Sequence, residues 1–517
     1  MFFLFPFNLI SFHSVMRSLF IIILTFIAVP AYSQQLSSDT WLVRNLSILH
    51  DFGYAWKLNT QYKPYRMENL LKIKLDDEFE KNWLASDLMS YTNRIHKKTE
   101  QDSNQVKGVL WLGVLNQTPT GSDKAFDSNA TSLYLLSQFW FRKNFSVEWV
   151  LRASSDPKAL DHFTPVPREI RRFGMNSAEF DHATLGYQNS WITLQFGRGR
   201  QVWGAGLQEN LMLSSSSAAY DHLLAEFRYK NLTGLFFTGF LESIVSEGQN
   251  NIRYISGHGL QYSNKKNLVL SLSEVSIYYG PNRPFDLVYL NPIVPHVEVE
   301  LNDRENDHRS NFSNAVWFAS LDWMLPNLFR LKASYLIDEF QIDKEDREQN
   351  RPDATAFQIK FSKSILFTKQ WFTLWGQLNR VGTYTFRHEK PFTTFLSRGL
   401  PLGIPTGSDY YDLTAGLTWI SPFRCIVDVS HTFREQGDNN LLENKYVPYE
   451  QFLKFDFPSG TIKTTKLFDL SILYSYRYNI DFVVNYKWQN EENLETSKSS
   501  NSFLFKINYH FPLVFSI

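Results

Sequence analysis

The chain has almost no cysteine, no excess charge of either sign and no long apolar run. Cys425 is the only cysteine among its 517 residues, so an internal disulfide and a cysteine-rich metal site are both excluded. The 52 Lys and Arg residues balance the 52 Asp and Glu residues, which leaves no surplus positive charge for nucleic acid or an anionic membrane surface. No run reaches the roughly 18 apolar residues of a transmembrane helix, which excludes a helical membrane protein.

Aromatic residues, by contrast, are abundant. The chain contains 44 Phe, 25 Tyr and 14 Trp, and 43% of its residues are hydrophobic. That apolar content excludes a disordered chain. Length alone suggests about three soluble domains of roughly 150 residues, but this many aromatic residues favours another class of protein.

The N-terminus has the pattern of a secretory signal peptide. Arg17 precedes an apolar run at 19–29, and Ala31-Tyr32-Ser33 gives a small-x-small cleavage pattern before Gln34. We expect residues 1–33 to be removed on export. An exported chain with almost no cysteine is typical of the bacterial envelope.

Segment 34–105 follows a helical period between Thr40 and Ile95. Leu42, Leu46 and Leu49 recur at helical spacing, and Leu84 and Leu88 repeat it later. Each short stretch has one apolar stripe, so it must pack on something else. We expect a helical segment that packs on the rest of the protein.

From residue 106 to residue 517 the period is two, as in strands. In 479–489, Ile480, Phe482 and Val484 lie on one face while Asp481 and Asn485 lie on the other. Roughly eighteen such segments of about ten residues follow one another, the length that a tilted strand needs to cross a membrane. The prediction is an all-β outer-membrane barrel of about 18 antiparallel strands.

The connections between these segments alternate in length. Short turns near 143–144, 230–231 and 363–369 alternate with long connections such as 198–221 and 280–314. Short periplasmic turns and long extracellular loops are typical of outer-membrane barrels, whereas a series of soluble β-sandwiches would not need this alternation. An even strand count places both termini, and therefore the helical segment 34–105, in the periplasm.

The densest local motif is the glycine- and arginine-rich stretch 197–206. It superficially resembles a phosphate-binding loop, but no helix-forming run and no Lys-Ser/Thr pair follow it. It is better interpreted as a strand end that enters a folded loop, in which glycines permit tight turns. Arg198, Arg200 and Trp203 would then contact sugar or line the lumen, or the arginines would pair with barrel carboxylates. The glycines predicted to shape the loop are Gly197, Gly199, Gly204 and Gly206.

Two long loops carry further candidates. The stretch 298–307 holds five acidic residues flanked by His296 and His308; it could bind a hard cation or simply be solvated, and we predict no metal site. In loop 435–465, Tyr446 and Tyr449 stand among amide and charged residues. Aromatic faces beside polar groups suit a carbohydrate, and packing of a plug loop is the alternative.

Nothing in the sequence indicates catalysis. Ser430 and His431 are adjacent on a predicted strand and point to opposite faces, so they cannot form a dyad. Ser256 and His258 share a face, but their companions Tyr254 and Leu260 suggest that this face meets lipid. We expect no enzyme and no cofactor.

Three stretches resemble the capsule assembly protein Wzi family of outer-membrane proteins: 42–53 (LVRNLSILHDFG), 196–214 (FGRGRQVWGAGLQENLMLS) and 289–302 (YLNPIVPHVEVELN). The resemblance implies an eighteen-stranded barrel with a periplasmic helical element, acting as a lectin that holds capsular or related exopolysaccharide at the cell surface. Arg198, Arg200, Trp203, Gly204 and Gly206 match the family's Arg/Trp-Gly loop.

The functional prediction is therefore a monomeric lectin-like barrel in the outer membrane. Its partners would be polysaccharide and outer-membrane lipid, and its predicted ligand contacts are Arg198, Arg200, Trp203, Tyr446 and Tyr449. A porin-like diffusion channel is the alternative, because inward residues such as Lys487 and Lys506 are polar. An envelope hydrolase with a site on a loop is a third, weaker alternative.

Overall fold

The computed structural model describes residues 35–36, 48–51, 62, 65–66, 82–87, 90, 107–121, 130–141, 144–159, 163–165, 167, 169–205, 209–246, 248–302, 313–339, 353–388, 390–443, 456–476, 480–494 and 496–516. The predicted signal peptide, residues 1–33, lies outside them, as does most of segment 34–105. Among the described residues, no helix is both long and apolar enough to cross a membrane.

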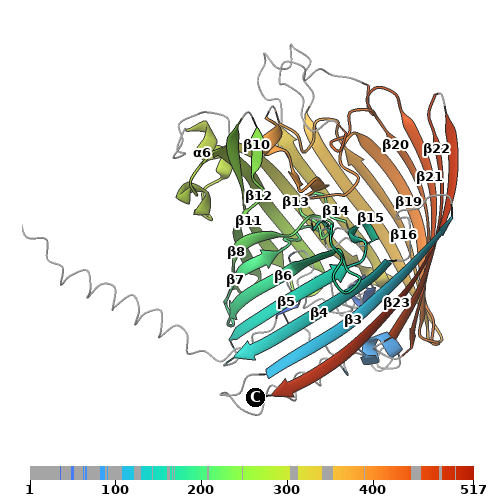
Figure 1. Ribbon diagram of the computed structural model, residues 1–517. Coiled ribbons are helices and arrows are strands. Elements are labelled where there is room, and N and C mark those ends of the chain that lie inside the picture. Colours follow the sequence, from blue (N-terminus) through green and yellow to red (C-terminus); the bar gives the residue numbers. More distant parts are fainter. Residues whose placement is uncertain are drawn as a thin grey trace, which may run out of the picture.

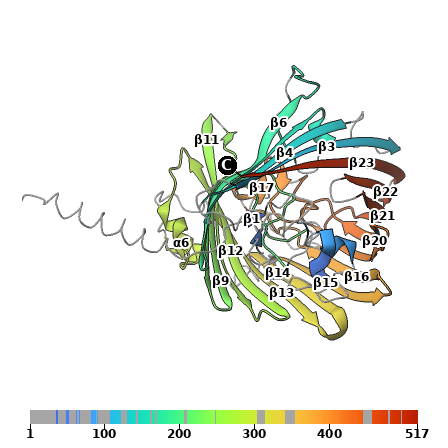
Figure 2. The same cartoon turned by 90° about the horizontal axis from the view of Figure 1, so that it is seen from below.

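Eighteen antiparallel strands close into a barrel (Figures 1 and 2). They are β3 Lys107–Gly121, β4 Ala130–Phe141, β5 Phe145–Ser154, β6 Ser177–Gln188, β7 Ile192–Gly199, β8 Tyr220–Tyr229, β9 Leu232–Phe240, β11 Gln249–Ser263, β12 Leu268–Pro281, β13 Ser313–Leu325, β14 Phe329–Glu339, β15 Ala354–Phe367, β16 Gln370–Val381, β19 Tyr410–Ile420, β20 Cys425–Gln436, β21 Lys463–Tyr476, β22 Ile480–Glu492 and β23 Ser497–Ser516. The last strand pairs with the first, with Lys506 opposite Gln117. The predicted strand number and the outer-membrane barrel fold are confirmed.

The shorter elements lie in the connections. They are β1 Gln35–Leu36 paired with β2 Tyr65–Arg66, β10 Ile244–Ser246, β17 Leu396–Ser397 paired with β18 Leu400–Pro401, α6 His296–Leu301, and the 3-10 turns η1 Pro157–Ala159, η2 Leu287–Leu290, η3 Pro326–Leu328 and η4 Pro391–Thr393.

The two faces of the wall differ as the alternating pattern predicts. On β23, Phe503, Phe505 and Ile507 point outward and are exposed, while Leu504 and Lys506 point inward and are half-buried. Exposed apolar side chains alternate with inward residues in this way on most strands, and such a surface is suited to lipid. The predicted turn at 363–369 is wrong in extent: β15 continues to Phe367, and only Thr368 and Lys369 separate it from β16. The apolar alternation continues through Ile365 and Phe367, and Ser364 bonds Thr373 across the pair.

Described parts of segment 34–105 contact the short-turn end of the barrel. Residues 48–51 and 83–87 are helical, whereas β1 and β2 form a small strand pair. The indole N–H of Trp83 donates to the carbonyl oxygen of Ser421 at 2.8 Å, and Asp87 pairs with Arg424. Tyr62 reaches farther, because its hydroxyl lies 2.9 Å from Ser273 Oγ on the inner face of β12.

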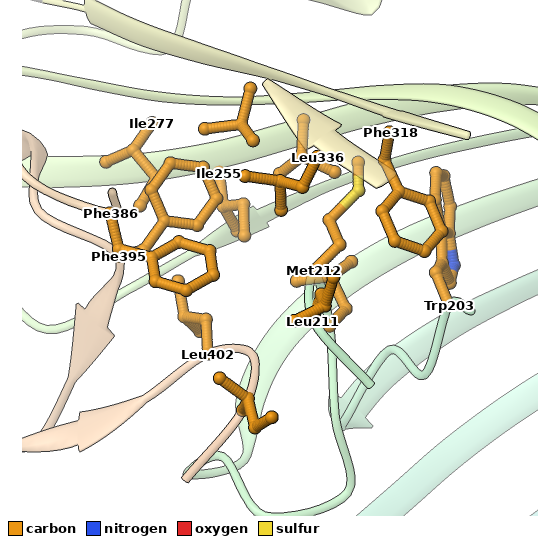
Figure 3. Close-up of a cluster of buried hydrophobic side chains, with 14 of the residues drawn as sticks. Trp203, Leu211, Met212, Ile255, Ile277, Phe318, Leu336, Phe386, Phe395 and Leu402 are labelled. Carbon is orange, nitrogen blue, oxygen red and sulfur yellow. The ribbon is translucent and has the colours of Figure 1, made fainter. Parts of the chain in front are cut away.

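Two loops fold into the lumen and meet in an apolar cluster, which we call the plug (Figure 3). Leu211 and Met212 come from loop 200–219, and Phe395 and Leu402 come from loop 382–409. They pack on inward wall residues that include Ile255, Ile277, Phe318 and Leu336. The two loops are joined directly, since the backbone N–H of Ser214 donates to the carbonyl oxygen of Leu402 at 2.8 Å. Buried apolar contact therefore holds the two loops together and against this side of the wall.

Candidate functional site at the loop end of the barrel

Charged side chains gather on the rim from which the long loops emerge. At the end of β7, Arg198 pairs with Glu179 of β6 at 2.6 Å and with Asp221 of β8 at 3.6 Å. Arg398, in the turn between β17 and β18, donates to the same carboxylate of Glu179 at 2.7 Å. We call Glu179, Arg198, Asp221, Glu242 and Arg398 the rim cluster.

Glu242 links the rim cluster to the loop that carries part of the plug. It accepts a hydrogen bond from the backbone N–H of Arg398 at 2.8 Å and pairs with Arg253 of β11 at 3.1 Å. The buried guanidinium of Arg253 also donates to the carbonyl oxygens of Thr394 and Leu396. Loop 382–409 is thus held to the wall through its residues 394–398.

The rim cluster can be reached by a ligand. The side chain of Asp221 is 62% exposed and that of Arg398 is 36% exposed. Arginines donate hydrogen bonds and carboxylates accept them. Together they suit a sugar chain, whose hydroxyl groups do both and whose acidic groups accept.

Arg200 differs from Arg198 in being buried. It forms a bidentate pair with Asp181, at 2.9 and 2.6 Å, and donates to the carbonyl oxygen of Ser217. Arg152 lies 3.5 Å from the same carboxylate. Arg200 therefore fastens loop 200–219 to the wall, which is the pairing with a barrel carboxylate that the sequence left open.

Trp203 is also completely buried. Its ring contacts Tyr62 and Phe237 edge to face, each at a centroid distance of 5.1 Å. Its backbone N–H donates to the carbonyl oxygen of Leu213 at 3.0 Å, which closes loop 200–219 on itself. In this structure Trp203 is a packing contact between the N-terminal segment, the loop and the wall.

The glycines of this stretch allow close backbone approach. Gly197 has φ of +142°, and a Cβ there would lie 2.1 Å from the carbonyl oxygen of Ala183. A Cβ on Gly199 would lie 2.9 Å from His182, and one on Gly204 would lie 2.1 Å from Asn210. Gly206 lies outside the described residues.

The other predicted ligand contacts, Tyr446 and Tyr449, lie outside the described residues as well. Arg198, Arg200 and Trp203 are close in the sequence, but their side chains point to different parts of the barrel. Arg198 lies on the rim, while Arg200 and Trp203 hold the loop.

An aromatic tip was missed in the sequence. Phe173 is fully exposed and Ile170 is largely exposed, in a hairpin where Arg172 and Met175 bond each other's backbone. Phe173 has φ of 52° and Gly174 has φ of 78°, so the turn holds the ring away from the protein. Arg398 donates to the carbonyl oxygen of Thr164 at 3.4 Å, which ties this loop to the rim cluster. The sequence signal for an exposed turn here is the Phe173-Gly174 pair, which follows two arginines.

The opposite end of the barrel holds a buried charged site, which we call the lower lock. Arg330 of β14 pairs with Asp322 of β13 at 2.7 and 2.5 Å and contacts His50 of the N-terminal segment. Lys332 pairs with Asp51 at 2.6 Å. These contacts fasten residues 48–51 inside the short-turn end.

Acidic pH is expected to loosen the lower lock. Burial and the neighbouring charges of Arg330 and Lys332 hold the pKa of His50 well below its usual 6.5. The undocked segment therefore binds a proton more readily than the docked one, so docking weakens as the pH falls below about 6.5, by up to about 1.4 kcal/mol per pH unit. In a Cys425→Ser background, electron paramagnetic resonance of a nitroxide at Ile48→Cys should show a growing mobile fraction between pH 7 and pH 5.

Two variants define the origin of this pH effect. His50→Gln cannot take up the proton and should flatten the pH profile, whereas His431→Gln, at an exposed position, should leave it unchanged. A profile that stays the same in His50→Gln would assign the pH effect to another group.

These features define an outer-membrane β-barrel of eighteen strands whose loops fold into its own lumen. The structure is similar to that of Wzi, an outer-membrane protein of Escherichia coli involved in group 1 capsule assembly and described as a carbohydrate-binding β-barrel. The two chains are 13% identical, the match covers 93% of this chain and 100% of Wzi, and the TM-score is 0.60. The resemblance to Wzi inferred from the sequence is thus confirmed in the fold.

A second similar structure is OccD3 (OpdP) of Pseudomonas aeruginosa, at 11% identity, with 78% of this chain and 91% of that chain covered and a TM-score of 0.46. No protein-family model and no curated protein matches the sequence.

Proposed function

We propose that this protein binds polysaccharide at the surface of the cell through the loop end of its barrel, without catalysing a reaction. The observation that carries the proposal is the plug: two long loops fold into the lumen, fill one side of it and hold a fixed, charged rim. A diffusion pore needs a continuous aqueous path instead. The fold shared with Wzi, whose description is a carbohydrate-binding barrel, supports the same function.

The ligand would lie across the rim cluster and the tip of Phe173. Sugar rings stack their C–H faces on exposed aromatic rings, while their hydroxyl groups bond to charged and amide side chains. Phe173 offers the aromatic face, and Arg198, Asp221 and Arg398 offer the polar contacts. Tyr446 and Tyr449 remain predicted contacts of the same ligand. Arg200 and Trp203 would act by holding the loop in place.

The test compares polysaccharide on cells with polysaccharide shed into the medium. In a deletion strain we expect glycan to move from cells to medium at unchanged total, and the wild-type gene should restore it. The double variant Phe173→Ala/Arg398→Ala should not restore it, because loss of an aromatic anchor and a charged contact weakens binding roughly tenfold or more.

A matched control is Phe423→Ala, which removes another largely exposed ring, from the short-turn end. It should restore retention fully. If glycan distribution is unchanged in the deletion strain, surface retention is refuted. If the deletion strain sheds glycan but the double variant retains it as wild type does, surface retention stands, and Phe173 and Arg398 are not its binding residues.

A second candidate function is diffusion along the unplugged part of the wall. On the inner face of β20–β22, Asp428 and Lys487 are exposed, and Asp469 lies directly opposite Lys487. Charged inner walls of this kind line porins. Single-channel recording of the wild-type chain in a planar bilayer separates the two functions, because a steady current would favour the channel.

A further inference from the structure

Two titratable residues interrupt the lipid-facing surface of the barrel. His258 of β11 shares its outward face with Leu260, which is 54% exposed, and Glu274 of β12 shares its outward face with Leu272, which is 62% exposed. The two polar residues lie directly opposite each other in the β11–β12 register. Polar side chains on the lipid face are costly unless something covers and pairs them.

The loop between β12 and β13 supplies the cover. Its described part, residues 282–302, folds back over the outside of the wall beside β11 and β12 (Figures 1 and 2), and α6 begins with His296, which is buried against the pair. His296 stacks edge to face on His258 at a centroid distance of 4.7 Å, and its backbone N–H donates to Glu274 Oε2 at 2.7 Å. Three possible metal ligands from three elements meet here.

The distances between the ligand atoms fit one metal ion. Glu274 Oε2 lies 3.2 Å from His258 Nε2 and 3.7 Å from His296 Nδ1, and the ligand atoms of all three residues lie within 4.8 Å of one another. Zinc bound tetrahedrally at about 2.0 to 2.2 Å separates its ligands by roughly 3.4 Å. Two of the three separations lie close to this value, and the third, between the two imidazole nitrogens, is at most 4.8 Å and would shorten on binding.

The imidazoles are also poorly satisfied by the protein. No described group forms a hydrogen bond of good geometry with either ring nitrogen of His296 or with Nδ1 of His258, although His296 is almost completely buried. Buried polar atoms are nearly always paired, and a bound ion is one of the ways in which an exception is satisfied. Glu274 is oriented as metal-binding carboxylates are, because the indole N–H of Trp317 holds its other oxygen at 2.8 Å.

We propose that His258, Glu274 and His296 bind a zinc-type divalent ion that fastens the α6 loop to the outer wall of the barrel. Two imidazoles and one carboxylate favour zinc over calcium or magnesium, which prefer oxygen ligands. The ion would neutralise the carboxylate and satisfy both rings in the lipid-facing row. This inference does not depend on the proposed polysaccharide binding.

The test uses the full-length chain in detergent, without a histidine tag, stripped of metal and then titrated with Zn²⁺ in competition with a chromophoric chelator. Wild type should bind one ion per chain. Removing a direct ligand should cost more than the tenfold to roughly 100-fold typical of residues behind the ligands, so His296→Ala and Glu274→Gln should weaken binding by at least about 100-fold.

His431→Ala is the matched control, because it removes an exposed histidine from another strand, and it should bind Zn²⁺ as wild type does. No saturable binding by wild type, or equal affinity in His296→Ala and Glu274→Gln, would overturn the proposal. If those variants fail to form folded barrels, X-ray absorption at the zinc edge of the wild type decides the matter. Two imidazole ligands are expected, and a shell of water and carboxylate oxygens alone would refute the site.

Discussion

Gly403→Val should open the plug and expose Met212, which the wild type buries completely. Gly403 lies where the two inward loops touch, and a Cβ at this position would lie 1.8 Å from the carbonyl oxygen of Leu211. That oxygen belongs to the backbone, so the contact cannot be relieved by a change of rotamer. One loop has to move away from the other.

The movement should be large in effect because it also pulls Leu211 and Met212 away from the apolar cluster that they share with Leu402. The bond from Ser214 to the carbonyl oxygen of Leu402, the residue before Gly403, would be lost. Overpacking of a filled core commonly costs about 1 to 3 kcal/mol, and here a loop that leaves the lumen can relieve it. The barrel wall does not depend on the plug for its backbone pairing, so the variant should still fold.

The measurement is the rate at which a water-soluble maleimide labels Met212→Cys in a Cys425→Ser background. Adding Gly403→Val should raise that rate about tenfold to 100-fold, in keeping with loss of about 1.4 to 2.7 kcal/mol of local protection. Single-channel current through the same variant should rise as well. Gly234→Val is the matched control, because no atom lies within 4 Å of a Cβ at that position. Equal labelling of both variants would mean that the loops are not held by this contact.

The barrel could be predicted from the sequence because its signals are local. Alternation along a strand such as 503–509 is set by neighbouring residues, and the difference between short and long connections is set by turn residues along the chain. A barrel can be predicted without knowing the register in which β23 pairs with β3. An even number of strands of sufficient length already implies closure, since an open edge cannot be left in lipid.

The sites could not be predicted in the same way because they depend on long-range contacts. Trp203 and Arg198 lie in one short motif, yet the first turns into the lumen and the second stays on the rim. Their orientations are set by different partners: Tyr62 and Phe237 pack on Trp203, and Glu179 pairs with Arg198. Likewise, His258 was assigned to a lipid-facing strand, and the loop that covers it could not be placed from the sequence.

The second large effect is expected at the lower lock. Asp322→Ala leaves the guanidinium of Arg330, which is 1% exposed, without its closest carboxylate partner and with the more distant Asp51, at 3.4 Å, to offset its charge. Breaking a buried ion pair from one side typically costs about 3 to 5 kcal/mol, because the remaining charge stays out of water. Urea unfolding of the barrel in detergent should show a loss of this size, and residues 48–51 should undock, since Arg330 also holds His50.

Two further variants show whether the charge or the side-chain volume matters. Asp322→Ala/Arg330→Met removes both charges, so it should recover most of the lost stability. Glu492→Ala breaks the exposed ion pair between Glu492 and Lys466, in which Lys466 is 42% and Glu492 is 46% exposed. Its loss should lower the free energy of unfolding by less than about 1 kcal/mol. The Arg330–Asp322 pair of the lower lock is therefore expected to contribute several kcal/mol more than the exposed pair, because its charges are buried. If Asp322→Ala costs no more than Glu492→Ala, Arg330 must reach water when its partner is removed, and the short-turn end would be less tightly closed than its contacts indicate.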